Sequence, residues 1–258
     1  MEILDKSDGK DPSASCEEAL TELYNICKEK DLFKVIRDRP SELFAIVGAD
    51  YPVRIERFFS PLFGIISRGA HLTAYVRTPE GIKIWVPRRA AWMPTYPNML
   101  DSTVAGGVPA SQTPFQNIVK EAGEEASLPP DVVRKGIHSA GVLTYMSRTD
   151  VGARAEPGLI IPDTVYLYDI ELPEDVIPKP HDTEVKEFYL MSVDEIKTHM
   201  KNKEFKTNCA VVMIDFFIRH GIITNDNEKD FLEINMRMHR HLPFKTAGRK
   251  KGNDSKLA

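Results

Sequence analysis

The sequence predicts an α+β protein, a mixed α/β/α sandwich preceded by a small N-terminal α/β extension. From residue 67 onward several strand-like segments follow one another, the first of which, "HLTAYVR", alternates in polarity and is β-rich. One sharply delimited helix interrupts these strands, and strongly apolar helical segments follow them. The chain has 258 residues, of which 42% are hydrophobic and 28% charged. It is therefore long enough for one large domain with a smaller attached unit.

The N-terminal part is the least regular. We expect residues 1–15 to be disordered and residues 16–66 to form the extension domain. A helix is predicted over roughly residues 16–30, because its apolar residues recur at helical spacing. Residues 31–66 mix short strand-like runs with turns. The sequence leaves open whether this extension is a lid, a substrate selector or a dimer contact.

The main domain is expected over residues 67–222. It opens with a hairpin, in which "HLTAYVR" and "IKIWVPRR" are strands and "TPEG" is a four-residue connection. The short strand "STVAGGV" comes next and ends in two glycines. Further strands are predicted in "SAGVLTYMSR", "LIIPDTVYLYDIEL" and "KEFYLMS".

Helices are expected toward the end of the chain. Ser192 is a predicted N-cap, and "NCAVVMIDFFIRHGII" is apolar enough to pack on the sheet. A last helix within residues 223–243 has Asn227 as its predicted cap. Residues 244–258 are predicted to be a disordered tail.

Composition excludes several classes of function. A net charge of −4 gives no basic footprint, which argues against nucleic acid as a partner. No apolar run approaches a membrane span, and the polar N-terminus does not resemble a signal peptide. Three cysteines without close spacing argue for a reducing compartment and against a disulfide framework or a zinc site. We therefore expect a cytoplasmic protein without membrane or nucleic-acid partners.

The helix around residue 120 has unusually clear ends. Thr113 is the predicted N-cap, Pro114 takes the one helical position that favours proline, and Gln116 completes a capping box. The helix should end near Leu128, because Pro129 follows.

Three glutamates, Glu121, Glu124 and Glu125, lie on one face of this helix. Its apolar residues form a neighbouring stripe: Phe115, Val119, Ala122 and Ala126. Like charges at this spacing repel by about 0.2–0.5 kcal/mol per pair, and only Lys120 is near enough to offset them. A charge run of this kind is most often a solvated face. Three converging carboxylates are also what a hard divalent cation such as Mg²⁺ binds.

The segment before the helix favours the second interpretation. Gly106 and Gly107 end a strand and let its backbone approach the helix or a bound diphosphate. This strand–loop–helix order resembles the Nudix box, G-x5-E-x7-R-E-U-x-E-E-x-G-U, where U is aliphatic. The matching residues are Gly106, Glu121, Glu124, Glu125 and Leu128. The departures are Gln112 for the early glutamate, Lys120 for arginine and Ser127 for the late glycine. They bear on affinity and rate more than on the fold.

The resemblance extends over roughly residues 30–225. Segments 83–108 and 204–226 are similar to a plant and fungal Nudix subgroup with an N-terminal extension, in which some members are fused to thiamine pyrophosphokinase. It implies Mg²⁺- or Mn²⁺-dependent hydrolysis of a small organic diphosphate to a monophosphate and phosphate. Thiamine diphosphate and its oxidised forms are the implied substrates. Nucleoside diphosphate derivatives, such as oxidised deoxynucleoside diphosphates or ADP-ribose, are the alternative.

The same resemblance implies roles for individual residues. The metal ligands would be Glu121, Glu124, Glu125 and the backbone carbonyl of Ala105. Glu184 would be a further acid that binds metal or acts as base, unless it is only a surface acid beside Lys186. The substrate-binding set would include Gly106, Gly107 and Lys120.

Residue chemistry adds candidates for substrate contact. Arg88 and Arg89 end a strand, and arginine's fork suits phosphate oxygens, although an ordinary ion pair would explain them equally. Trp92 and Tyr96 could stack on a heteroaromatic ring or pack at the rim of the core. The histidines lack ligand spacing and are predicted to be structural: His71, His138 and His181.

Two other functions are weighed against hydrolysis. An isomerase of isoprenoid diphosphates would need a cysteine in the site, and none of Cys16, Cys27 and Cys209 is expected near the metal face. A binding module without turnover would explain the three departures from the box. The sequence is compatible with a monomer or a homodimer.

Overall fold

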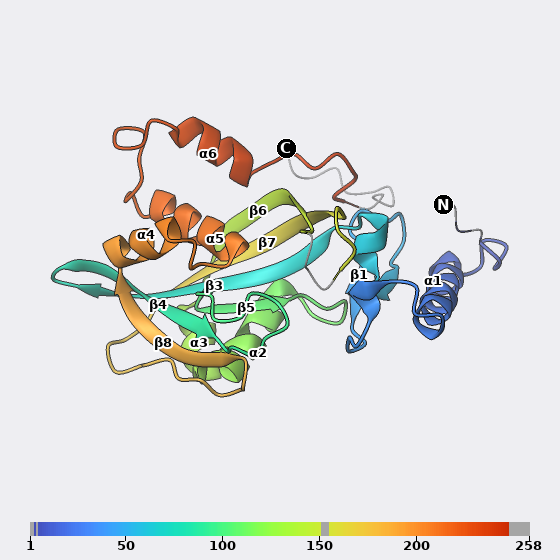
Figure 1. The fold of residues 1–258 in the computed structure, drawn as a ribbon, viewed down its shortest axis with the longest axis horizontal. Helices are drawn as coiled ribbons and strands as arrows, with labels where there is room; N and C mark the ends of the chain where they lie inside the picture. Colours follow the sequence, from blue (N-terminus) through green and yellow to red (C-terminus); the bar gives the residue numbers. More distant parts are fainter. Residues whose placement is uncertain (1–2, 4, 151–154, 248–258) are drawn as a thin grey trace.

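The computed structural model describes residues 3, 5–150 and 155–247, and it confirms the α+β class (Figure 1). Its centre is a six-stranded sheet with strand order β6-β7-β3-β4-β8, and β5 pairs with β3 off this path. The strands are β3 (Ser67–Thr78), β4 (Gly81–Arg89), β5 (Val104–Gly107), β6 (His138–Arg148), β7 (Ile160–Glu171) and β8 (Val185–Ser192). The sheet is mixed, because β3 pairs with β7 in parallel and with β4 and β5 antiparallel.

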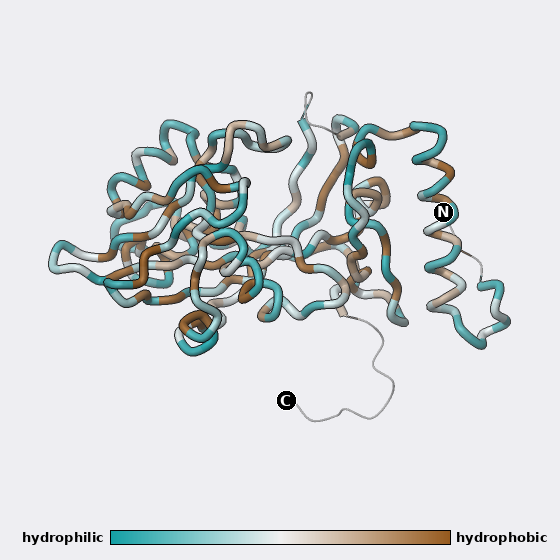
Figure 2. The backbone as a smooth tube through the Cα atoms, turned by 90° about the horizontal axis from the view of Figure 1, so that it is seen from below, coloured by the Kyte–Doolittle hydropathy of each residue, from teal (hydrophilic) through white to brown (hydrophobic). Residues whose placement is uncertain are grey.

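Helices cover both faces of this sheet. One face packs against α2 (Pro114–Ala126) and α3 (Pro130–Gly136), around a core that includes Leu72 and Ile118. The other packs against α4 (Val193–Lys201) and α5 (Thr207–Arg219). α6 (Phe231–Met238) lies over β6, outside this second layer (Figure 1). Hydrophobic stretches gather in the interior of this main body (Figure 2).

The extension has a separate core. It contains α1 (Pro12–Glu29), the two-stranded sheet of β1 (Leu43–Ala45) and β2 (Arg54–Glu56), and two short 3₁₀ helices, η1 (Lys34–Ile36) and η2 (Ser60–Phe63). Tyr24 and Phe59 meet edge to face in this core, with ring centroids 5.5 Å apart. Hydrophobic and hydrophilic residues alternate along α1, as expected for a helix with one buried face (Figure 2).

The predicted capping residues fix two helix starts. Thr113 and Gln116 form a capping box at α2, and Ser192 with Glu195 forms another at α4. α2 ends at Ala126 and is capped by Ser127, two residues before Pro129; the φ of Ser127, 53°, is left-handed. The Nudix box has glycine at this position, and the backbone conformation explains that preference.

Several boundaries differ from the predictions. α1 begins at Pro12, because the Asp11 side chain accepts a hydrogen bond from the Ala14 N–H, so residues 12–15 are helical rather than disordered. The β3–β4 connection has two residues, since Thr78 pairs with Gly81. α6 begins only at Phe231, and Asn227 instead caps a turn by accepting from the Thr224 N–H. α3 was not predicted.

Some predictions concern residues that the structure does not describe. The predicted disordered tail lies largely outside the described residues, as do residues 1–2 and 4. None of the helices within the described residues is long and apolar enough to cross a membrane.

Candidate active site

The three glutamates of α2 differ in their surroundings. The Glu124 side chain is 52% exposed, and its carboxylate lies 2.5 Å from Lys120 Nζ. Glu121 is 21% exposed and lies 3.7 Å from the same ammonium. Glu125 is partly buried and accepts a hydrogen bond from the Ala105 N–H at 3.0 Å. Glu124 thus fits a solvated face, whereas Glu121 and Glu125 lie against β5.

The glycines of β5 permit this close approach. A Cβ on Gly106 would lie 2.6 Å from Glu121 Cγ and 2.9 Å from Asn117 Nδ2, so no larger residue fits between strand and helix. A Cβ on Gly107 would meet Phe44 and Arg57 of the extension, at 2.8 and 2.9 Å. The strand end predicted to approach the helix is therefore covered on one face by α2 and on the other by the extension.

The charges of the two inward glutamates are poorly compensated. Burial raises the pKa of Glu125 well above its ordinary value; the Ala105 N–H opposes this, and nearby Asp101 adds to it. Burial also raises the pKa of Glu121, with Lys120 opposing. Like-charged carboxylates in a partly buried site are stabilised by a bound cation. The local chemistry therefore fits a hard cation with oxygen ligands.

The carboxylates of the site suit a metal ion in their chemical type and in their position along α2. Within the described residues, no three His, Cys, Asp or Glu side chains converge closely enough to form a ready metal site. The ion pair of Glu124 with Lys120 would have to open for all three glutamates to share one cation. The role of the Ala105 carbonyl stays a prediction.

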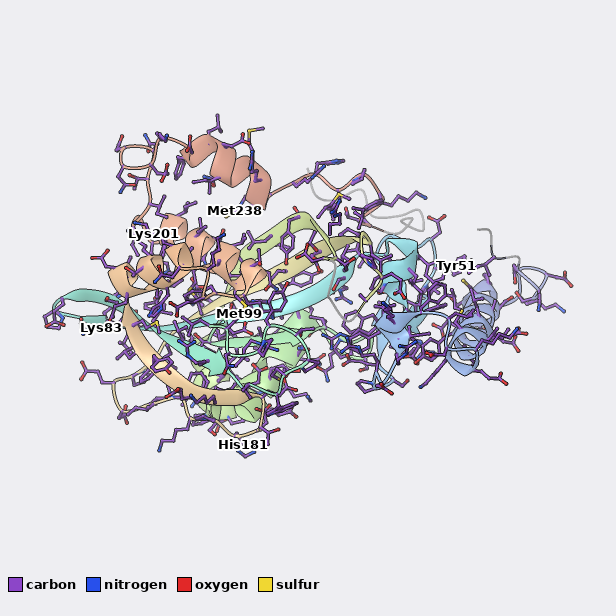
Figure 3. All side chains as sticks on the ribbon, in the orientation of Figure 1. Tyr51, Lys83, Met99, His181, Lys201 and Met238 are labelled. Carbon is purple, nitrogen blue, oxygen red and sulfur yellow. The ribbon has the colours of Figure 1, made fainter. Side chains whose placement is uncertain are left out.

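A loop before β8 brings further acids to α2. The Asp182 N–H donates to the Glu124 carbonyl at 3.2 Å, and the Glu184 N–H donates to the Asp182 carboxylate at 2.9 Å. Glu184 is exposed, yet close enough to contribute to the raised pKa of Glu121, and Asp182 contributes to that of Glu125. Glu184 was a predicted site residue, and Asp182 was missed. His181 of the same loop lies at the periphery of the main body (Figure 3).

Arg88 and Arg89 both have protein partners. Arg89 pairs with Asp101 at 2.8 Å and also donates to the Thr95 carbonyl. Arg88 donates to the Asn98 carbonyl at 2.8 Å. These bonds hold the loop that follows β4, and phosphate binding by either arginine stays a prediction.

The aromatic residues of that loop are accessible. Trp92 is 60% exposed, and its indole N–H donates to the Thr183 carbonyl at 3.0 Å, which places it beside the acid-bearing loop. Tyr96 is 43% exposed and has a left-handed φ of 52°. Phe115, predicted in the buried stripe of α2, is instead 37% exposed at its edge. The stacking role of Trp92 and Tyr96 stays a prediction.

A buried polar cluster behind β5 was not predicted. Burial alone would raise the pKa of Asp101, but Lys206 and Arg89 beside it hold that pKa well below its usual range. Cys209 Sγ lies 2.7 Å from an Asp101 oxygen and 4.0 Å from Nδ1 of His71. His71 pairs across the strands with Ala105, so Cys209 lies nearer to the site than expected. Burial lowers the pKa of His71 to about 4, which keeps it neutral and fits its predicted structural role.

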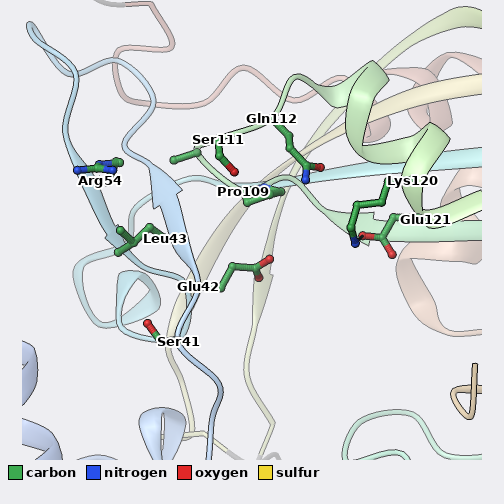
Figure 4. A pocket seen from close by; sticks show the side chains of 10 residues that line it. Ser41, Glu42, Leu43, Arg54, Pro109, Ser111, Gln112, Lys120 and Glu121 are labelled. Atoms are coloured by element: carbon green, nitrogen blue, oxygen red, sulfur yellow. Dashed lines mark ion pairs between the residues drawn. The ribbon is translucent and has the colours of Figure 1, made fainter. Parts of the chain in front are cut away.

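Two cavities adjoin the Gly106–Gly107 strand end. The first, called here the extension cavity, has a volume of about 490 Å³ and lies between β1, the β5–α2 loop and α2 (Figure 4). Glu42, Gln112, Lys120 and Glu121 are among its lining residues. The second, the α5-side cavity, has about 140 Å³ on the sheet face that carries α5. Its lining includes Arg57, Arg68, Tyr145, Asp163, Lys206 and Asn208.

Comparison with known proteins gives independent information about the family of this chain. No protein-family model matches the chain. Over 221 residues the chain is 32% identical to the chloroplastic Nudix hydrolase 20 of Arabidopsis thaliana, with 85% of this chain and 57% of that protein covered. This similarity supports the predicted Nudix family.

The chain is also similar to a yeast protein and to a solved NUDIX domain. The uncharacterised Saccharomyces cerevisiae protein YJR142W is 42% identical over 200 residues, covering 75% of this chain and 58% of its own. The NUDIX domain of Shewanella oneidensis NrtR, solved with ADP ribose, gives a TM-score of 0.45 at 10% identity, covering 59% of this chain and 86% of its own. The chain spans somewhat more than half the length of the curated relatives it matches.

Proposed function

We propose that this protein is a Nudix hydrolase that cleaves a small organic diphosphate to a monophosphate and phosphate. The observation that carries the proposal is the contact between α2 and the glycine end of β5. There Glu121 and Glu125 are partly buried with poorly compensated charge. Its similarity to Nudix hydrolase 20 supports the same chemistry.

We assign the residues of the site to metal binding, proton transfer and phosphate binding. Glu121, Glu124 and Glu125, with the Ala105 carbonyl, would hold Mg²⁺ or Mn²⁺. When bound, the cation supplies neutralisation of the diphosphate charge and polarisation of a phosphorus atom. A carboxylate at this edge, from α2 or from Glu184, accepts the proton of the attacking water. Lys120 is placed to bind a phosphate oxygen once Glu124 releases it.

For the organic end we propose a thiamine-type ring, especially an oxidised one. The α5-side cavity lies beside the Gly106–Gly107 strand end, where the diphosphate would be bound. Three of its lining residues are cations, Arg57, Arg68 and Lys206. They would repel the positive thiazolium ring of thiamine more than an oxidised ring that has lost this charge. The exposed Trp92 and Tyr96 offer aromatic faces for stacking.

Release of the monophosphate product from a panel of diphosphates, followed by chromatography, tests the proposal, because ADP-ribose would yield two monophosphates and no inorganic phosphate. Thiamine diphosphate, its oxidised forms, ADP-ribose and an oxidised deoxynucleoside diphosphate would be compared with and without Mg²⁺. We expect Mg²⁺-dependent release, with the highest kcat/KM for oxidised thiamine diphosphate. Trp92→Ala should reduce that preference by about 0.5–1.5 kcal/mol if one stacked pair carries it. A tenfold advantage for ADP-ribose or the deoxynucleotide would contradict the thiamine substrate and leave the hydrolase. No release from any compound would contradict the hydrolase itself.

A further inference from the structure

The extension is joined to the candidate active site through the loop between β5 and α2. The Ala110 N–H of this loop donates to the Leu43 carbonyl of β1 at 2.8 Å. The next residue toward the N-terminus, Glu42, lines the extension cavity together with Lys120 and Glu121 (Figure 4). Residues of the extension therefore form a wall of the site.

Arg57 reaches the opposite face of β5 from the same extension. A Cβ on Gly107 would lie 2.9 Å from its Cζ and Nη2, so the guanidinium rests directly on the glycine backbone. The Glu42 carboxylate accepts from Nη1 at 2.8 Å, and the rings of Phe44 and Phe58 lie 5.2 Å from Cζ. Nε and Nη2 make no hydrogen bond to the described residues. The guanidinium is thus fixed in place but retains donors, and its side chain is 39% exposed.

The cavity that Arg57 lines is predominantly cationic. Arg68 and Lys206 line it as well, against one acid, Asp163. Arg68 Nε is buried without a hydrogen-bond partner among the described residues. Ala105 also lines the cavity, and its backbone N–H donates to the Glu125 carboxylate. Cationic side chains lie on one face of β5 and acidic side chains on the other. A diphosphate lying across the strand end could contact the cations directly and the acids through a bound metal ion.

We propose that the N-terminal extension completes the substrate site, with Arg57 binding phosphate oxygens of the diphosphate and Glu42 orienting its guanidinium. Arginine suits this role because its planar fork matches two phosphate oxygens. The choice of a diphosphate as the ligand rests on the proposed function. The competing explanation is that the Arg57–Glu42 pair only fastens the extension to the main body.

Binding of inorganic diphosphate tests the inference without requiring turnover. Isothermal titration with Mg²⁺ present would compare the parent with Arg57→Gln, Arg57→Lys and Glu42→Gln. Arg37→Gln is the matched control, because Arg37 forms an exposed ion pair with Asp31 in the same extension. We expect Arg57→Gln to weaken binding about tenfold or more, since a hydrogen bond between charged groups is lost. The affinity of Arg57→Lys should lie between those of the parent and Arg57→Gln. Glu42→Gln should lose less affinity than Arg57→Gln, and Arg37→Gln should bind as tightly as the parent.

Measurements of folding distinguish phosphate binding by Arg57 from a role in which the Arg57–Glu42 pair only attaches the extension to the main body. The melting temperature and the rate of proteolysis within residues 1–66 are measured for every variant. Equal binding by Arg57→Gln and Arg37→Gln would overturn the inference, as would a parent that does not bind inorganic diphosphate. Equal losses in Arg57→Gln and Glu42→Gln, each matched by loosening of the extension, would also overturn it in favour of a fastener. Arg57-dependent binding in a protein that hydrolyses no diphosphate would sustain it and contradict the proposed function alone.

Discussion

Alanine at position 106 should damage the active site more than the fold. The added methyl would lie 2.6 and 2.8 Å from Cγ and Cδ of Glu121, distances that real contacts essentially never show. Glu121 must therefore turn away from β5. Overpacking of this kind costs about 1–3 kcal/mol. For a chain of this size that corresponds to a fall in melting temperature of roughly 2–12 °C. Mg²⁺-dependent phosphate release should fall much further, because the carboxylate no longer faces its neighbours.

Gly123→Ala provides the matched control on the facing helix. A Cβ at Gly123 meets nothing within 4 Å, and alanine is favoured over glycine inside a helix by about 0.5–1 kcal/mol. This variant should melt slightly higher than the parent and keep its activity. Thermal unfolding followed by circular dichroism, with phosphate release on the same samples, compares the two. Parental stability and activity in Gly106→Ala would refute the argument that only glycine fits between β5 and α2.

Three further predictions concern charged side chains in and around the site. Glu125→Gln and Glu124→Gln should each abolish most Mg²⁺-dependent turnover. Without metal, only Glu125→Gln should raise the melting temperature, because only that charge is buried; equal shifts would contradict this. Burial raises the pKa of Asp163 to about 6, so its charge destabilises the fold above that pH by roughly 3 kcal/mol and not below pH 4. Asp163→Asn should therefore stabilise the protein at pH 7.5 but not at pH 4, unlike the exposed Asp175→Asn; a pH-independent gain would exclude the charge as cause. Asp101→Asn leaves Arg89 and Lys206 unpaired and should cost about 3–5 kcal/mol in urea unfolding, and a loss below about 1 kcal/mol would show that the cations find other partners.

The predictable parts of this fold are those with local signals. Thr113, Pro114 and Gln116 specify the start of α2 within four residues, and that start is confirmed. β-Rich composition bounded by turn signals predicted a strand at each strand of the main sheet, and the structure confirms these strands. The spacing of Glu121, Glu124 and Glu125 placed all three on one helix face. Each of these inferences needs only residues a few positions apart.

The parts that were missed depend on contacts between distant segments. The parallel pairing of β3 with β7 joins residues about a hundred positions apart and leaves no local pattern. The same holds for Asp101, which pairs with Arg89 and Lys206 and so gives Arg89 a protein partner that the sequence did not indicate. Asp182 comes to α2 only because a loop folds back along it. Arg57 stands in an irregular stretch, and its contact with Gly107 follows from how the extension docks.

The glutamate cluster itself shows how energetics decides between the two original interpretations. A solvated face would leave all three acids exposed, where repulsion is weak and water screens it. Here only Glu124 is in that state, while Glu121 and Glu125 bear the cost of burial that their raised pKa values record. Glycine at position 106 brings them closer to the strand, which increases that cost rather than relieving it. An arrangement that keeps carboxylates charged and partly buried at a strand end lowers the stability of the empty protein. A bound cation would offset this cost, and this is the physical reason for expecting a metal there.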